Sequence, residues 1–286
     1  TFFIPPYQRN YEWGVVICRV LLGDVRSVAE SALEGKETQH FFGSIVYVVE
    51  DTGFGLPNKY ILTDGQQRIT STMLLLMALR DTIADDSYKK YIQSRYIQND
   101  RADADTEYKI KLKQVETDWE AYKHLALGEP VPVRLRTSRV NKNYEFFVRE
   151  LNSLTDDLKR AYLEKGLDKF SVISIRLEPD QNPWENPQEI FESMNSLGAP
   201  LSLADLVRNY LLMGKTSKQQ TALYNRYWLP LERQLPGRLS EFIRDWMRSD
   251  QHRSYKVARE SNYKELYSQF KEIVAKRKVE DLLEDF

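Results

Sequence analysis

The sequence predicts an α+β protein in which a small mixed unit at residues 1–85 precedes a mainly helical region at 86–286. Two β-branched and aromatic runs near the N-terminus predict strands, whereas helical spacing of apolar residues dominates after residue 85. A later run, FSVISIRLE at 170–178, predicts a strand that returns to the first sheet. A length of 286 residues permits two domains or one large one.

The first predicted unit begins with an extended segment, because the Pro5–Pro6 pair excludes a helix there. Apolar residues at helical spacing then predict a helix over 15–33. HFFGSIVYVVE at 40–50 and YILTD at 60–64 predict two antiparallel strands joined by a glycine-rich loop. The run at 67–83 is apolar almost all round, which is typical of a buried helix.

The second predicted region consists of helices in addition to the returning strand. Their apolar spacing places them near 86–97, 114–127, 138–152, 155–166, 187–196, 202–213, 218–227, 239–249 and 261–283.

Composition limits the classes of function. Lys plus Arg is 41 and Asp plus Glu is 42, so the net charge of -1 gives no global attraction to nucleic acid, although a local basic face is left open. Cys18 is the single cysteine, which excludes an internal disulfide and a cysteine metal cluster and favours a reducing, cytoplasmic setting. No membrane-spanning run or signal peptide is visible. Since the chain begins with Thr1, we expect a fragment of a longer protein.

LTDGQQRITS, at 62–71, stands where a strand gives way to the buried helix. A purely structural interpretation is an Asp-Gly turn followed by a capping box between Asp64 and Gln67. The functional alternative is a phosphate site, because the first amides of a helix lack partners. Gly65 has no Cβ, so an anion can approach the backbone. Arg68 opposes the helix dipole unless an anion lies nearby, and the capping interpretation does not explain it.

The same stretch supplies candidates for catalysis. Asp64 would hold a magnesium ion beside bound phosphates or orient the attacking water. Gln66 or Gln67 would position phosphate oxygens or that water, and Thr70 adds a hydroxyl on the next turn. The chain contains no G-x-x-x-x-G-K-[ST] sequence, so a P-loop is excluded.

Two other stretches support a nucleotide site. In IPPYQRNYEW, Tyr7, Gln8 and Arg9 combine an aromatic face with an arginine fork that suits phosphate, although an edge segment with a solvated arginine explains them too. IFESMNSLGAPLSLADLVRNYLL at 190–212 reads as helix, break and helix, in which Ser202 and Asp205 fit a capping box. Its remaining polar candidates are Asn195, Asp205, Arg208 and Asn209.

With these motifs in order over residues 3–212, the chain resembles the DGQQR-motif domain at the N-terminus of GmrSD-type, modification-dependent (type IV) restriction enzymes. The resemblance rests on IPPYQRNYEW, FFGSIV, DGQQRITS and FESMNSLGAPLSLADLVRN. It implies a ParB-like nucleotide-binding unit followed by helices. It also implies binding and hydrolysis of nucleoside triphosphates, with recognition of modified DNA. The nuclease of such enzymes is a separate His-Asn-His type domain, which His40, His124 and His252 do not form here.

Two other functions stay open. A DNA-sensing module would use a basic cluster, although such a cluster is also typical of a solvated helix face. Its members are Arg134, Arg136, Arg139 and Lys142. A scaffold that holds a partner nuclease would need no nucleotide. The oligomeric state is open, and a homo-oligomer is compatible with the sequence.

Overall fold

The computed structural model describes residues 1–53, 57–100, 102, 107–182, 184–195, 201–249, 263–275 and 277–286. The chain forms two compact units, each with its own hydrophobic core. Unit 1 comprises Thr1–Ile4 and Asn10–Glu178, and unit 2 comprises Pro5–Arg9 and Pro179–Phe286.

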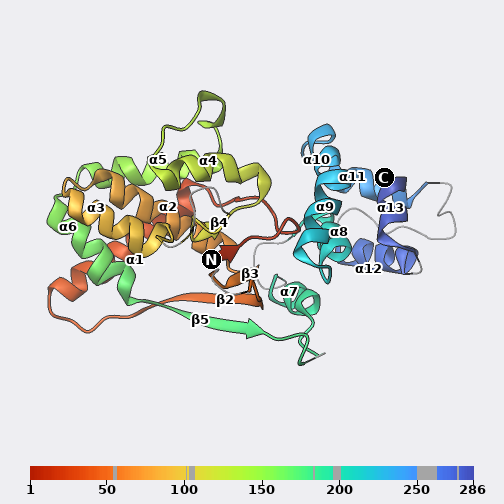
Figure 1. Cartoon of the computed structure of the whole chain (residues 1–286), viewed down its shortest axis with the longest axis horizontal. Coiled ribbons are helices and arrows are strands. Elements are labelled where there is room, and N and C mark those ends of the chain that lie inside the picture. The colour runs from red at the N-terminus through yellow and green to blue at the C-terminus, as the bar shows by residue number, and fades with distance from the viewer. Residues whose placement is uncertain are drawn as a thin grey trace. The chain divides into compact units, whose positions relative to one another are not determined.

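Unit 1 contains a five-stranded mixed sheet in the order β4-β1-β3-β2-β5. As predicted, β2 and β3 are antiparallel, and the strand expected at 170–178 returns as β5, which runs parallel to β2 at the edge of the sheet (Figure 1). The strands are β1 (Phe2–Phe3), β2 (His40–Glu50), β3 (Lys59–Asp64), β4 (Leu112–Lys113) and β5 (Phe170–Leu177).

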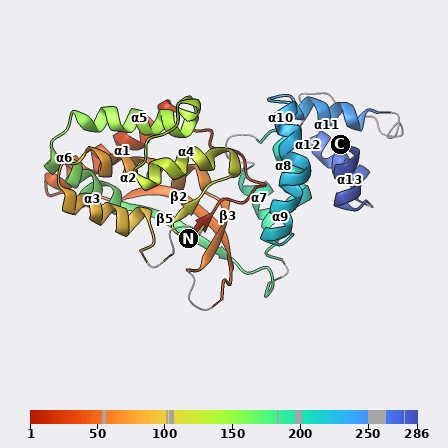
Figure 2. The ribbon, with the colours of Figure 1, turned by 45° about the horizontal axis from the view of Figure 1, so that its top comes forward.

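Helix α2 (Gln66–Thr82) lies at the centre of unit 1 and is buried on nearly every side, as its sequence predicts. Helices α3 (Asp86–Ile92), α4 (Glu116–Leu127) and α5 (Arg139–Asn152) pack against it. The other helices of the unit are α1 (Val15–Leu33) and α6 (Asp156–Ala161), and all of them are labelled in Figures 1 and 2. Short helical turns complete the unit: η1 (Gln93–Ile97), η2 (Val133–Leu135), η3 (Tyr162–Gly166) and η4 (Leu167–Lys169).

The division into units falls after Glu178, whereas the sequence suggested a boundary after residue 85. The reason is the all-round burial of α2. A helix without a polar face needs cover on each side, and α3, α4 and α5 supply it from beyond residue 85. These helices therefore share one core with the sheet.

Unit 2 is helical, as expected for this part of the chain. Its helices are α7 (Pro187–Asn195), α8 (Leu203–Leu212), α9 (Ser217–Leu223), η5 (Tyr224–Trp228), α10 (Leu229–Gln234), α11 (Leu239–Met247), α12 (Tyr263–Val274) and α13 (Val279–Asp285). The capping box of Ser202 and Asp205 is present at the start of α8. The single helix expected at 261–283 is wrong, because α12 ends at Val274 and α13 begins at Val279. Residues 261 and 262 lie outside the described residues.

Candidate functional site

Two sequence motifs meet where β3 passes into α2. The pairing of β2 with β5 shifts register between Phe41 and Ser44, and Gly43 lies in this irregularity with φ of 100°. Bulges of this kind bend a strand and re-aim its neighbours, and they are frequent beside active sites. The FFGSIV motif therefore provides a distorted stretch of strand next to the start of α2.

Gly65 is the N-cap residue of α2 and adopts the left-handed conformation, with φ of 95°. No side chain caps the helix, so the predicted capping box of Asp64 and Gln67 is wrong. The side chain of Gln67 is bound elsewhere, and β2 lies against Gly65: a Cβ there would stand 3.1 Å from the Ser44 carbonyl oxygen. The glycine thus serves the backbone conformation and the packing of β2.

Arg68 lies in the first turn of α2 and is held beside the bulge. Its Nη1 donates a hydrogen bond of 2.9 Å to the Ser44 carbonyl and lies 3.5 Å from Asp64 Oδ2. Both side chains reach solvent, with exposed fractions of 31% for Arg68 and 23% for Asp64. In the described part of the chain all hydrogen bonds of this guanidinium use Nη1, so Nε and Nη2 keep free donors.

Gln66, next to the cap, has an unmet hydrogen-bond requirement. Its side chain is 6% exposed, and its Oε1 is buried without a hydrogen-bond partner among the described residues. A buried amide oxygen without a partner is costly and indicates a bound group or a water. Asp64, Gln66 and Arg68 are therefore the sequence-predicted residues that keep capacity for a ligand at this helix start.

The neighbouring candidates Gln67 and Thr70 are used by the protein itself. Gln67 Oε1 accepts hydrogen bonds from the backbone N–H groups of Glu12 and Trp13, and its Nε2 donates to the Asn10 carbonyl. Thr70 is 1% exposed and its hydroxyl donates to the Gln66 carbonyl. Both side chains therefore hold the backbone around the site.

Two residues that the sequence did not single out hold the same segment 10–13. Asp118 Oδ2 accepts a hydrogen bond of 2.6 Å from the Tyr11 N–H, and Asn143 Nδ2 donates to the Tyr11 hydroxyl and the Trp13 carbonyl. Burial raises the pKa of Asp118 to about 6. No local sequence signal marks these residues, because their partners lie more than a hundred positions away.

The motif residues Tyr7, Gln8 and Arg9 belong to unit 2. The Tyr7 side chain is 3% exposed and lies in the core of that unit. Its carbonyl accepts a hydrogen bond of 3.1 Å from Arg208 Nε, and the same guanidinium is paired with Asp205 and Glu232. Asn195 is the last residue of α7, and its side chain lies outside the described part.

The chain matches the family model of the GmrSD restriction endonuclease N-terminal domain over residues 1–212. The chain belongs to this family. This membership confirms the resemblance found in the sequence motifs. The chain is therefore a module of a restriction and phage-defence system. Members of the GmrSD family pair with a nuclease domain. No curated protein matches the chain significantly.

The GmrSD match extends over unit 1 and continues into unit 2 as far as the end of α8. The segments after α8 are outside it. The sites at Arg68 and at Tyr7 both lie within the matched range, so each is part of the family's domain.

The basic residues expected to contact DNA lie on η2, directly after it, and at the start of α5 in this GmrSD domain. All four are exposed: Arg134, Arg136, Arg139 and Lys142. Arg134 is paired with Glu120, and Arg139 donates to the Glu12 carbonyl. Two of the four side chains therefore already interact with other groups of unit 1.

The described residues contain no group of three or more His, Cys, Asp or Glu side chains placed to hold a metal ion. Asp64 can supply one carboxylate to a magnesium ion that takes its other ligands from phosphates and water. Among the helices that the structure describes, none is both long and apolar enough to cross a membrane.

Proposed function

We propose that this GmrSD N-terminal domain binds nucleoside triphosphates at the start of α2 and hydrolyses them. It would act as the regulatory module of a modification-dependent restriction system, in which cutting of modified DNA belongs to a separate His-Asn-His type nuclease domain. The observation that carries the proposal is the Arg68 guanidinium, which stands in solvent contact in the first turn of α2 with two nitrogens unpaired in the described chain.

The local charges suit a polyanion. The amides of the first turn have no partners within the helix, and the helix dipole places partial positive charge there. Arg68 adds a full positive charge, and the Ser44 carbonyl orients it. The buried Gln66 Oε1, an acceptor without a partner among the described residues, suits the attacking water and not a phosphate oxygen. Asp64 is the one acidic group in contact with this guanidinium in the described chain, and the 3.5 Å separation leaves the pair open to a phosphate.

In the hydrolysis step, water attacks the γ-phosphorus and the bond from that phosphorus to the β–γ bridging oxygen breaks. The products are a nucleoside diphosphate and inorganic phosphate, and the proton of the attacking water passes to solvent. Arg68 would offset the negative charge that builds on the phosphate oxygens, while Asp64 or Gln66 would orient the water. A well-placed donor of this kind contributes about 3 kcal/mol to the transition state.

A bound magnesium ion would neutralise phosphate charge, and Asp64 is the residue placed to hold it. The carboxylate lies 3.5 Å from Arg68 Nη1, so the metal and the guanidinium would both offset the charge of the same anion.

Calorimetric titration with each nucleoside triphosphate, together with phosphate release, tests the proposal. We expect Arg68→Ala to lower the rate of phosphate release about 100-fold or more, as for removal of one charge-stabilising donor. Arg26→Ala is the matched control, because Arg26 is an exposed helical arginine of unit 1 that pairs with Glu30. Equal affinity and equal turnover in the wild type and Arg68→Ala would remove the nucleotide site from α2.

A DNA-sensing or scaffold module that does not hydrolyse nucleotide is the second candidate. The exposure of Arg136 and Lys142 on one stretch favours DNA contact. A DNA-binding face would lose affinity steeply as salt rises, and Lys142→Ala would reduce that salt dependence by about one charge. A flat salt response leaves the scaffold as the surviving alternative.

A further inference from the structure

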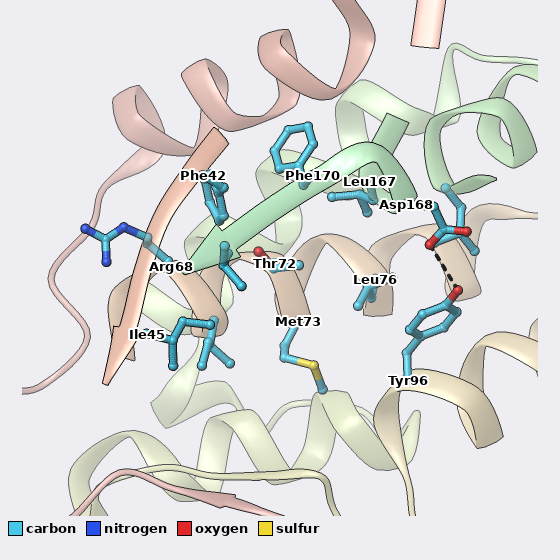
Figure 3. Close-up of a pocket in the computed structure, with 13 residues that line it drawn as sticks. Phe42, Ile45, Arg68, Thr72, Met73, Leu76, Tyr96, Leu167, Asp168 and Phe170 are labelled. Carbon is cyan, nitrogen blue, oxygen red and sulfur yellow. Dashed lines mark hydrogen bonds between the residues drawn. The ribbon is translucent and has the colours of Figure 1, made fainter. Parts of the chain in front are cut away.

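Unit 1 contains an apolar cavity of about 220 Å³ that no step of the proposed nucleotide reaction uses. It lies between α2 on one side and β2 and β5 on the other. Its buried lining, the floor, includes Met73, Leu76 and Leu163, and its exposed lining, the rim, includes Asp168 and Val172. Figure 3 labels Met73, Leu76 and Asp168 among the residues around it. Figure 3 shows the Arg68 guanidinium directed away from it, so only the stem of that side chain faces the cavity.

The cavity opens to solvent at Asp168 and Val172, so a ligand could enter it without unfolding of the core. Its walls are packed side chains, and a hollow of this size among such residues is uncommon because cores are close-packed. An apolar cavity of about 150 Å³ is known to stay dry and to bind benzene. A cavity of 220 Å³ with a similar lining therefore has room for two fused rings.

The lining of the cavity favours a flat, apolar ligand. Phe42 and Phe170 stand at the β2–β5 side with ring centroids 5.3 Å apart. Aliphatic side chains of α2 and η3 form the opposite wall. Aromatic ligands pack favourably on such rings in offset or edge-on geometry. A purine would fit by size, but its several polar ring atoms would find few partners on these walls.

A carboxylate on the rim of the cavity would orient a bound ligand. Asp168 Oδ1 accepts a hydrogen bond of 3.4 Å from the Tyr96 hydroxyl, drawn as the dashed line in Figure 3. In the described chain, Asp168 Oδ2 has no hydrogen-bond partner. A ligand donor at the rim would meet a carboxylate oxygen there, and hydrogen bonds to charged groups are the stronger kind.

We propose that this cavity is a binding site for a neutral, planar, two-ring compound of the indole type, whose single N–H donates to Asp168. The ring system would pack against the apolar floor, and the Asp168 carboxylate on the rim would accept a hydrogen bond from the N–H group. The site is separate from the nucleotide site, and its occupation does not depend on hydrolysis.

Indole is the probe, and benzofuran, which has the same shape without the N–H group, is its matched partner. Calorimetry on the full chain should show that indole binds more tightly than benzofuran. The substitution Asp168→Ala should make the two affinities equal. Methyl NMR signals of Met73, Leu76 and Leu163 should move on addition of indole. No binding up to millimolar indole, or shifts confined to other methyl groups, would overturn the proposal.

Two tryptophan substitutions on β5 separate blockage of the cavity from general disturbance of the strand. Val172 lines the cavity and is 41% exposed, whereas Ile173 points to the other face of the sheet and is 54% exposed. Val172→Trp should weaken indole binding at least tenfold, and Ile173→Trp should leave it unchanged. Equal weakening by both, or displacement of indole by excess ATP, would contradict a separate site.

Discussion

The Arg68 side chain lies directly against Gly43: a Cβ atom on Gly43 would stand 2.9 Å from Arg68 Nε and 3.1 Å from its Cζ. The same two motifs touch a second time, where Gly65 leaves room for the Ser44 carbonyl. Each motif thus contributes one glycine to the fit, and the lack of a side chain on Gly43 leaves room for Arg68 in the position from which it reaches the Ser44 carbonyl. FFGSIV and DGQQR therefore form a single site in unit 1.

Gly43→Ala should displace the Arg68 guanidinium, because the new methyl group would overlap its Nε. We expect nucleoside triphosphate affinity to fall about tenfold, which corresponds to the loss of one charged hydrogen bond. Gly53→Ala is the control, since Gly53 also has a positive φ but no atom of the described residues lies within 4 Å of the added Cβ. Calorimetry on both variants separates backbone strain, which they share, from the displacement of Arg68. Similar affinities for the two variants would show that the Gly43 contact does not position Arg68.

Substitution by alanine should affect stability at Gln67 and nucleotide affinity at Gln66, although the two glutamines are adjacent in α2. Gln67→Ala removes three hydrogen bonds to the backbone of Asn10, Glu12 and Trp13, so the free energy of unfolding should fall by about 3 kcal/mol. Gln66→Ala removes a buried oxygen that has no described partner, so stability should change little while nucleotide affinity falls. Urea unfolding and calorimetry on the same samples check both parts. A large loss of stability in Gln66→Ala would mean that its amide is satisfied within the protein.

Local patterns predicted two elements of this fold to the residue and most others to within a few residues. The helix at 15–33 and the strand at 40–50 have the bounds expected from apolar spacing and β-branched composition. The errors concern contacts that no local window contains. The capping box failed because Gln67 binds a segment more than fifty positions away, and the extent of unit 1 depends on helices that return to cover α2.

The candidate site shows the same limit. The sequence placed Arg68 beside Asp64 at a helix start, and the structure has them there. It gave no role to Gly43 or Ser44, although a glycine within a strand pattern is itself a signal for a bulge. Asp118 and Asn143 carried no signal at all, because their function in holding residues 10–13 exists only in the folded chain.

Asp118 should make stability depend on pH in a direction unusual for a carboxylate. Burial raises its pKa from 3.8 to about 6, so the folded protein binds the proton more tightly than the unfolded chain. Between about pH 4 and 6 the unfolded state releases the proton first, and stability contributed by this group falls as pH rises. Two pKa units correspond to about 3 kcal/mol.

Asp118→Asn tests this dependence, since an amide oxygen can still accept from the Tyr11 N–H. Its stability relative to the wild type should increase from pH 4 to pH 7, and urea unfolding at intervals of half a pH unit measures the difference. Asp157→Asn, a change in an exposed carboxylate of α6, serves as the control. A difference that stays constant over this range would place the pKa of Asp118 near its ordinary value.

Tyr7→Ala should destabilise unit 2, because it removes a core aromatic ring and leaves a cavity. The cost expected for such a truncation is about 3–5 kcal/mol. Hydrogen exchange should therefore accelerate in α8 and α11 while α2 keeps its protection. Tyr91→Ala, at a 43% exposed aromatic of unit 1, provides the comparison. Unchanged exchange in α8 would show that the Tyr7 ring adds little to that core.

Because Tyr7 packs with residues that follow position 190, the order of synthesis matters for this protein. The segment at Pro5–Arg9 is translated before most of unit 1, whereas the helices that surround it are translated after unit 1. Unit 1 can therefore form its core before the helices of unit 2 that pack around this segment have been synthesised. For the same reason, a recombinant fragment that starts at residue 179 would lack a tyrosine of its own interior, and adding a peptide with the sequence of residues 1–9 should restore it.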